Sequence, residues 1–472
     1  MALKMRPGRM SDEPGVGDRV RLTVAGRACE MVQEGLVLEP VAADCITIKL
    51  VNGYNVTHPL TDIESVLLLD SAAESSSAGG SAEAAAGEET PQPDQQTGLP
   101  LVVLLHTGGT IASRVDYATG AVTARFEPEE IIDAVPELRR IACIEAVKLG
   151  NMWSDDMRPR HWNRILEASA EAFAGGAVGV VITHGTDTMH LTAAAMAFGW
   201  AGSGGRPPGR VVLSGAQRSS DRGSTDAAEN LIAAVHWAAR GPTPSGHRDA
   251  AVIVMHATAS DGVCAVIAGC AARKSHSSRR DAFESIDQPP IATIAIEAGG
   301  CSISMSENAA GASEPAADRP LVSQPTLYSE QTAIAEFVAN GHMQPRFVAA
   351  AIGAGADALL IHGTGLGHLP LDDPAGDSPE NTELAALFRD YCAGGGIAVV
   401  STQCISGPVN MDVYAKGRDQ QQLGLIGHGA SAPPAIALVK LHHLLSRGLD
   451  AAGIQAVWAS DLVGENPLSI RE

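Results

Sequence analysis

The sequence has few aromatic residues, few lysines and no long apolar run. Phe, Trp and Tyr make up 4 % of the 472 residues, and six lysines stand against 27 arginines. No apolar stretch reaches the roughly 18 residues of a membrane span, and no apolar segment follows the basic N-terminus, so neither a membrane span nor a signal peptide is expected. The net charge of −21 predicts a surface that repels nucleic acid, so another subunit would have to hold any RNA.

Signatures of metal, nucleotide and serine-hydrolase sites are also missing. The eight cysteines form no Cys-x-x-Cys pair, and the histidines form no His-Glu-x-x-His motif, so we expect no metal site and free thiols in a reducing cytoplasm. Gly363-Thr-Gly-Leu-Gly-His lacks the ending of a phosphate-binding loop, and no Gly-x-Ser-x-Gly elbow is present. The chain itself is therefore expected to carry no cofactor.

The N-terminal fifth of the chain differs in composition from the rest. Residues 1–14 predict a disordered lead, and residues 15–70 carry short alternating strands with a hairpin signal at Asn52-Gly53. This pattern predicts a small β-barrel-like module. Low complexity over 71–100, rich in Ala, Ser and Gly, predicts a flexible linker.

The remaining sequence alternates between strand-like and helical segments. Residues 101–305 contain β-branched apolar runs followed by helical stretches such as Pro159–Ala174, and a smaller region at 326–472 repeats the alternation. A segment rich in Ala, Glu and Pro at 306–325 predicts a second linker. The alternation predicts an α/β fold with two domains built on parallel sheets.

Two buried strands are predicted to end in threonine motifs. One strand runs from Leu101 into Thr107-Gly-Gly-Thr110, and the other runs from Val178 into His184-Gly-Thr186-Asp187. Ligands bind outside the carboxyl ends of strands in open α/β sheets, so Thr110 is a candidate nucleophile. The Thr186 hydroxyl can bind or activate, and the Asp187 carboxylate can hold a substrate ammonium group. The alternative is that these residues only cap a turn or the helix predicted at His190–Trp200.

Further polar groups follow other strands. A site lysine can lower its pKa and serve as a base, so Lys274 is a candidate, although a solvated basic loop is the usual meaning of its Arg-Lys-Ser-His surroundings. Ser154 and Asp155 suit the head group of an α-amino acid, and they could equally be loop residues.

Taken together, these segments resemble the asparaginase/glutaminase family. The resemblance rests on Thr107-Gly-Gly-Thr110-Ile-Ala-Ser and His184-Gly-Thr186-Asp187-Thr188-Met, and it implies an asparaginase-like fold. Within that family the chain is most similar to the D subunits of archaeal-type glutamyl-tRNA(Gln) amidotransferases, through Ser214-Gly-Ala-Gln-Arg-Ser-Ser-Asp-Arg, Arg273-Lys274-Ser-His-Ser-Ser-Arg-Arg-Asp-Ala-Phe, Gly363-Thr-Gly-Leu-Gly-His and the N-terminal module. One departure is Ala435, where relatives usually carry the Glu of a Pro-Glu pair.

The resemblance implies a role for each candidate. Thr110 matches the family nucleophile, and Lys274 would activate Thr186 while Asp187 orients the lysine and the substrate amine. Ser154 and Asp155 match the substrate carboxylate and amino-group contacts. Tyr117 would close on the substrate from a mobile lid over Ser113–Phe126.

The same resemblance implies partners. Ammonia from Gln or Asn would pass to an E subunit that binds tRNA and uses ATP with Mg²⁺ in the complex, and the D subunits would form a homodimeric core. Two alternatives stay open: a stand-alone asparaginase, and a scaffold that has kept the fold and lost catalysis. The intact set of Thr110, Thr186, Asp187 and Lys274 speaks against the scaffold, and the module at 15–70 favours the amidotransferase.

Overall fold

The computed structural model describes residues 14–24, 31–38, 44–50, 55–70, 98–109, 113–115, 122–124, 132, 134–219, 224–297, 300–306 and 319–468. The chain forms two compact units, which are described separately. The first comprises Met1–Gln95, Ser113–Arg125 and Arg218–Thr225, and the second comprises Gln96–Ala112, Phe126–Gln217 and Asp226–Glu472. Most of the predicted lead and of both predicted linkers lies outside the described residues, so the segment boundaries proposed from the sequence stay predictions.

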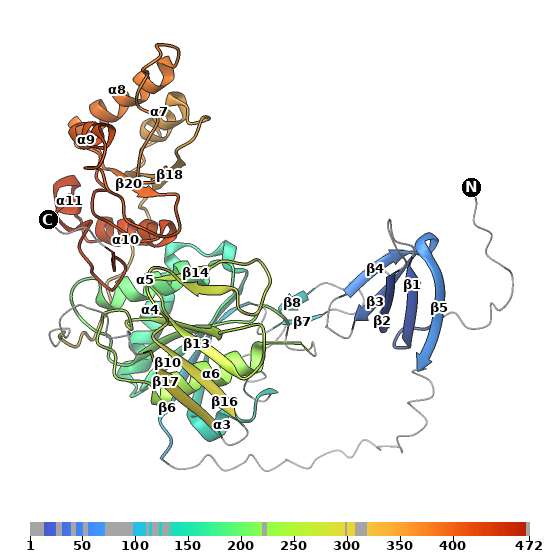
Figure 1. The fold of residues 1–472 in the computed structure, drawn as a ribbon. Helices are drawn as coiled ribbons and strands as arrows, with labels where there is room; N and C mark the ends of the chain where they lie inside the picture. The colour runs from blue at the N-terminus through green and yellow to red at the C-terminus, as the bar shows by residue number, and fades with distance from the viewer. Residues whose placement is uncertain are drawn as a thin grey trace, which may run out of the picture. The chain divides into compact units, whose positions relative to one another are not determined.

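The first unit contains a five-stranded antiparallel sheet in the order β4-β3-β2-β1-β5 (Figure 1). The strands are β1 (Arg19–Val24), β2 (Met31–Leu38), β3 (Cys45–Leu50), β4 (Asn55–Pro59) and β5 (Ile63–Asp70), with a short 3₁₀ turn, η1 (Leu60–Asp62), before β5. Alternate residues of β1 are buried, as an antiparallel sheet with one covered face requires. Their core consists of Val20, Leu22, Val24, Val37, Ile46 and Ile48. This is the β module that the sequence predicts, although the Asn52-Gly53 turn lies outside the described residues.

A short antiparallel pair, β7 (Ser113–Val115) and β8 (Val122–Ala124), also belongs to the first unit. It falls within the segment predicted as a lid. Tyr117 lies outside the described residues, so its proposed role stays a prediction.

The second unit is built on an eight-stranded sheet in the order β17-β16-β13-β12-β11-β10-β6-β9. Its strands are β6 (Leu101–Gly108), β9 (Cys143–Met152), β10 (Gly179–Thr183), β11 (Arg210–Ser214), β12 (Val252–His256), β13 (Val263–Ala268), β16 (Ala292–Glu297) and β17 (Gly300–Met305). The strands from β9 to β12 are parallel, as predicted, whereas β13, β16 and β17 add antiparallel. The sheet is therefore mixed.

The order of the parallel strands places a switch point beside β6. The chain passes from β6 to β9 on one side and then to β10 on the other, so the connections leave β6 in opposite directions. A crevice at such a point is the usual ligand site of an open α/β sheet. Every residue of β10 is buried, which fits a strand covered on both faces.

Helices cover this sheet and deliver residues to its carboxyl edge. They are α3 (Leu138–Ile141), α4 (Pro159–Ala174), α5 (Met189–Ala201) and α6 (Ala227–Arg240), together with the 3₁₀ turn η3 (Ser154–Asp156) and the hairpin β14 (Ala272–Lys274) with β15 (Phe283–Ser285). Eleven of the 13 residues of α5 are buried. A helix that is apolar all round must be covered on both sides, and α10 (Pro434–Ser446) lies against it (Figure 1).

A smaller parallel sheet follows in the order β18-β19-β20. It contains β18 (Ile334–Val338), β19 (Ala358–Gly363) and β20 (Ala398–Thr402), and its helices are α7 (Pro345–Gly353), α8 (Pro379–Ala393) and α9 (Ala415–Gln422). The predicted second parallel sheet is thus present. Its own core includes Val348, Leu359, Ile361, Leu384, Phe388 and Val400.

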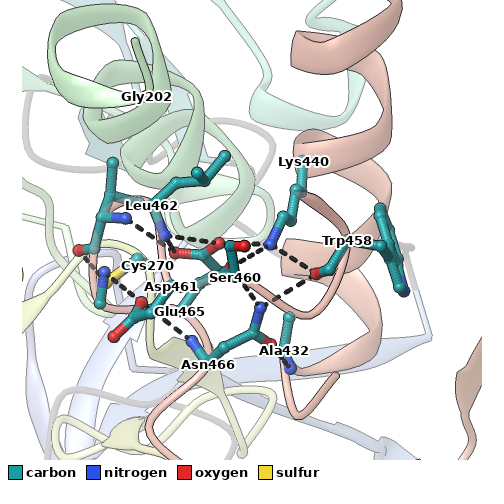
Figure 2. A network of polar contacts seen from close by, with 12 residues as sticks. Gly202, Cys270, Ala432, Lys440, Trp458, Ser460, Asp461, Leu462, Glu465 and Asn466 are labelled. Carbon is teal, nitrogen blue, oxygen red and sulfur yellow. Dashed lines mark hydrogen bonds and ion pairs between the residues drawn. The ribbon is translucent and has the colours of Figure 1, made fainter. Parts of the chain in front are cut away.

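The C-terminal segment returns to the core of the larger sheet. Apolar residues of α10 and α11 (Ala451–Val457) belong to the same buried cluster as β6 and β10. The segment after α11 is held by a buried ion pair, in which Lys440 Nζ lies 2.6 Å from Glu465 Oε1 and both side chains are fully buried (Figure 2). Lys440 also donates to the carbonyls of Trp458 and Ser460, each at 2.7 Å.

The seven cysteines in the described part of the chain are all free. Burial raises the pKa of Cys264 and of Cys270 well above the ordinary thiol value, so both are inert thiols. Among the described residues, no helix combines the length and apolarity that a membrane crossing needs.

Candidate active site

The candidate site lies where β6 and β10 end side by side. The two strands are parallel, with His106 opposite Thr183. His106 Nδ1 lies 2.8 Å from Thr183 Oγ1, and Thr107 Oγ1 donates to the Thr183 carbonyl at 2.9 Å. These buried contacts tie the two strand ends together, so the loops that leave the two strands start next to each other.

Gly109 lets the chain leave β6 in close contact with the next strand. Its φ is +92°, and a Cβ there would lie 2.5 Å from Gly185 N. Both facts require glycine. Thr110 is the next residue in the sequence but lies outside the described residues, so its role as nucleophile stays a prediction.

The second threonine motif forms a connected group with Lys274. Lys274 Nζ lies 2.8 Å from Thr186 Oγ1 and 2.6 Å from Asp187 Oδ1. Lys274 comes from β14, far from β10 in sequence, and its side chain is 8 % exposed. Lys274 therefore does not lie in a solvated basic loop, which was the alternative that its neighbours in the sequence suggested. Its ammonium group instead points inward to the end of β10.

Asp187 does not cap helix α5 either, which was the alternative to a functional role. The N-cap of α5 is Thr188, and no side chain caps the helix there. Asp187 pairs with Lys274 instead, and its carboxylate is 70 % exposed. One carboxylate oxygen is thus engaged by the lysine while the group faces solvent, where a substrate cation could reach it.

Ser154 packs against the same strand end. It is buried in η3, and its carbonyl accepts a hydrogen bond from Thr188 Oγ1 at 2.6 Å. A Cβ at Gly185 would lie 2.9 Å from Ser154 Cβ, so the two backbones are in close contact. Asp155 is the next residue of η3 and is exposed. The structure thus brings Ser154 to Gly185 and Thr188, the residues that flank Thr186 and Asp187, and leaves Asp155 at the surface.

A buried histidine that the sequence reading overlooked supports the second motif. His184 Nδ1 lies 2.6 Å from the Gly185 carbonyl, and Nε2 lies 2.9 Å from Thr192 Oγ1 on α5. Burial lowers the pKa of His184 to about 4, so the ring is neutral and acts as a fixed hydrogen-bonding spacer. Its position between Thr183 and Gly185, inside the motif, is the sequence signal that could have identified it.

A cavity of about 460 Å³ opens beside Lys274. Asp187, His190, Lys274 and Ala435 line it, together with the Glu336 and His362 pair, in which His362 Nε2 lies 3.0 Å from Glu336 Oε1. Burial, with Arg273 and Lys274 nearby, lowers the pKa of His190 to about 4. The cavity therefore combines a neutral histidine, a lysine and two carboxylates, which suits a small zwitterionic substrate.

Comparison with known proteins gives this arrangement a family context. The family described as "Asparaginase, N-terminal" matches residues 101–309, and "Glutaminase/Asparaginase C-terminal domain" matches residues 337–458. The glutamyl-tRNA(Gln) amidotransferase D subunit of Thermofilum pendens is 36 % identical over 453 residues, covering 95 % of this chain and 92 % of that protein. The corresponding D subunit of Thermococcus kodakarensis is 36 % identical over 457 residues, covering 96 % and 94 %.

Solved structures agree on the fold. The thermostable L-asparaginase from Thermococcus kodakarensis superposes with a TM-score of 0.61 at 24 % identity, covering 77 % of this chain and 98 % of that one. L-asparaginase I from Vibrio cholerae gives 0.61 at 25 % identity, covering 78 % and 99 %. The amidotransferase relatives match about 95 % of the chain, whereas the asparaginases match about three quarters of it.

Proposed function

This chain belongs to the family of glutamyl-tRNA(Gln) amidotransferase D subunits, and we propose that it releases ammonia from an amide donor for a tRNA-dependent amidotransferase. The observation that carries the proposal is the Lys274 contact with both Thr186 and Asp187 at the end of β10. The amide donor would be Gln or Asn. Thr110 would be the nucleophile, because it follows Gly109 at the neighbouring strand end.

The chemistry proceeds in two halves. Thr110 Oγ attacks the side-chain amide carbon, loses its proton to a base and forms a tetrahedral oxyanion, which backbone N–H groups near the glycine turn stabilise. The C–N bond then breaks, a proton reaches the nitrogen, and ammonia leaves an acyl-threonine. In the second half water adds to the acyl group, and its collapse frees the acid and restores Thr110.

Lys274 would be the base of the second catalytic group. Lys274 Nζ donates to Thr186 Oγ1 at 2.8 Å; once it has given up a proton, the amine could take one from Thr186, and Thr186 could then take one from water or from the nucleophile. Asp187 would hold Lys274 through its contacted oxygen and bind the substrate ammonium group with the rest of its exposed carboxylate. Ser154 and Asp155 would contact the substrate carboxylate and amino group.

The partner roles belong to the complex. We propose that an E subunit binds the mischarged tRNA and uses ATP with Mg²⁺, that the D subunits form a homodimeric core, and that the complex works in the cytoplasm. The full-length match to D subunits, N-terminal sheet included, supports this reading over a stand-alone asparaginase. The connected Lys274, Thr186 and Asp187 group supports an active enzyme over a scaffold.

The test is ammonia release from glutamine and asparagine by the full chain, alone and with the E subunit, Glu-tRNA(Gln), ATP and Mg²⁺. We expect weak release alone and a strong rise with the complete system, and no release by Thr110→Ala. Equal and fast release by the chain alone would favour a free asparaginase. No release under either condition would refute both enzymatic readings.

A substitution pair tests the role of Lys274. Lys274→Arg keeps a cation that can contact Asp187 but cannot lose its proton, so a base role predicts a loss in kcat of about 10²–10⁴, similar to Lys274→Met. If Lys274→Arg retains kcat within a few-fold of the unmodified chain while Lys274→Met does not, the lysine acts through its charge and the base role is wrong.

A further inference from the structure

A second group of polar side chains lies at the carboxyl end of β12, two strands away from β10. Glu229 stands in the first turn of α6, His256 is the last residue of β12, and Asp261 lies in the turn between β12 and β13. One ligand atom from each of the three residues lies within 4.8 Å of the others. None of these residues belongs to the site described above.

The hydrogen bonds around His256 define which ring nitrogen carries a proton. Asn230 Nδ2 donates to the Gly215 carbonyl and to Asp226 Oδ2, both at 3.0 Å, so its Oδ1 is the acceptor. His256 Nδ1 lies 2.6 Å from that Oδ1 and must therefore donate. In the neutral ring this leaves Nε2 with a lone pair and no proton.

That lone pair faces carboxylates. His256 is 1 % exposed, and Nε2 is a buried atom that makes no hydrogen bond to any described residue. Glu229 Oε2 nevertheless lies 3.1 Å from it. A lone pair at this distance from a carboxylate oxygen is repulsive unless a positive charge lies between them.

We propose that Glu229, His256 and Asp261 bind a divalent transition-metal ion of the Zn²⁺ or Co²⁺ class. One imidazole nitrogen and two carboxylate oxygens are a donor set that such ions accept, with water completing the shell. Asp261 is exposed, which leaves an entry path from solvent. Ligand atoms of a tetrahedral zinc site lie roughly 3.3 Å apart, so the flexible Asp261 side chain would close in on the ion.

The surrounding contacts orient the ligands as metal sites require. Asn230 fixes the tautomer and plane of His256, and the Gly262 N–H donates to Glu229 Oε2 at 2.9 Å. Arg280 pairs with Asp261 Oδ1 and leaves the second oxygen for the ion. A sequence search for paired cysteines or His-Glu-x-x-His could not find this group, because its three members come from three separate elements.

The ion would clamp the start of α6 to the turn after β12. Asn230 links this clamp to the Gly215 carbonyl, and a Cβ on Gly215 would lie 2.5 Å from the His184 carbonyl. The proposed site is thus one side chain away from the backbone that carries the second threonine motif.

The test uses the full chain after removal of metals with a chelator and of any affinity tag. Co²⁺ and Zn²⁺ are titrated alone, with calorimetry for stoichiometry and the visible Co²⁺ spectrum for a nitrogen-containing site. We compare the unmodified chain with Asp261→Asn and Glu229→Gln, which keep shape and a hydrogen-bond acceptor. Asp390→Asn, an exposed carboxylate on α8, is the matched control.

The unmodified chain and Asp390→Asn should bind one equivalent more than the two site variants, or bind it at least tenfold tighter. Zn²⁺ should raise the unfolding temperature of the unmodified chain and of Asp390→Asn, and not that of the two site variants. Equal binding by all four would assign the metal to other histidines and overturn the proposal. No saturable binding by the unmodified chain would overturn it too. Because Asp261 is exposed, its variant should fold even where a change at His256 would not.

Discussion

Replacing Lys440 with Met should destabilise the second unit by several kcal/mol. Lys440 and Glu465 are both fully buried and form an ion pair between α10 and the C-terminal segment (Figure 2). Removing one partner of a buried pair typically costs about 3–5 kcal/mol, because the other charge stays buried without compensation. The long apolar body of Met retains the packing of the lysine stem, so the change isolates the charge.

The contacts show which group would be left without a compensating partner after the substitution. The Trp458 and Ser460 carbonyls lose Lys440 but keep Asn466 Nδ2, at 3.2 and 2.9 Å. The carboxylate of Glu465 keeps the backbone N–H groups of Leu462 and Val463 and its contact with the Asp461 side chain. The cost therefore falls mainly on the carboxylate, and adding Glu465→Gln should relieve part of it, because Gln removes the charge and still offers an oxygen to those N–H groups.

The measurement is denaturant unfolding of four proteins, followed by tryptophan fluorescence: unmodified, Lys440→Met, Glu465→Gln and the double variant. The double variant should be more stable than Lys440→Met, with a coupling energy on the order of 1–3 kcal/mol. Arg389→Met, which breaks an exposed pair on α8, is the control and should cost at most about 1 kcal/mol. A Lys440→Met cost no larger than the control, or costs that simply add in the double variant, would refute the reasoning.

Two further predictions concern Gly109 and the buried histidines. Gly109→Ala should destabilise the fold by about 1–3 kcal/mol and sharply lower ammonia release, because its φ is +92° and the new methyl group would meet Gly185. The control is Gly341→Ala, whose methyl group meets open space and should change neither stability nor ammonia release. Equal effects of the two variants in unfolding and activity assays would contradict this prediction. Stability should also fall as pH drops from about 6.5 toward 4, because burial lowers the pKa of His184 to about 4 and that of His443 to about 3. The unfolded chain then binds protons that the folded chain cannot, so the free energy of unfolding falls by up to about 1.4 kcal/mol per pH unit for each histidine. An unfolding midpoint that does not change with pH across this range would show that the two rings are protonated in the folded chain as well.

The parts of the fold that could be predicted are those that local sequence determines. Strands such as β10 are β-branched apolar runs that end in Gly and Thr, and the helix predicted at Pro159–Ala174 agrees with α4 because Pro suits the first turn. The antiparallel addition of β13 could not be predicted in this way. Its apolar residues are equally compatible with a parallel strand, and only the connection after His256, which is too short for a parallel crossover, makes the pair antiparallel.

Lys274 is a candidate from the sequence, but the long-range partners of this lysine and of Lys440 are not visible in their local segments. Lys274 lies in a basic segment that is typical of solvated loops, and the packing of β14 against α5 brings it to Thr186. Lys440 stands between apolar neighbours on α10, and its burial depends on Glu465 in a segment that has no sequence relation to the helix. Thr186 and Asp187 could be identified because their motif comes directly after a predicted buried strand.

The exposure of Asp187 gives a physical reason why ammonia release should depend on the assembled complex. Lys274 is nearly buried while Asp187 is 70 % exposed, so water screens one side of the pair in the free chain. Covering the carboxylate would remove that water and strengthen its hold on a substrate ammonium group. The same acidic group that selects the substrate would therefore be at its strongest only when something closes over it. This is the physical reason to expect weak ammonia release from the chain alone and faster release in the assembled system.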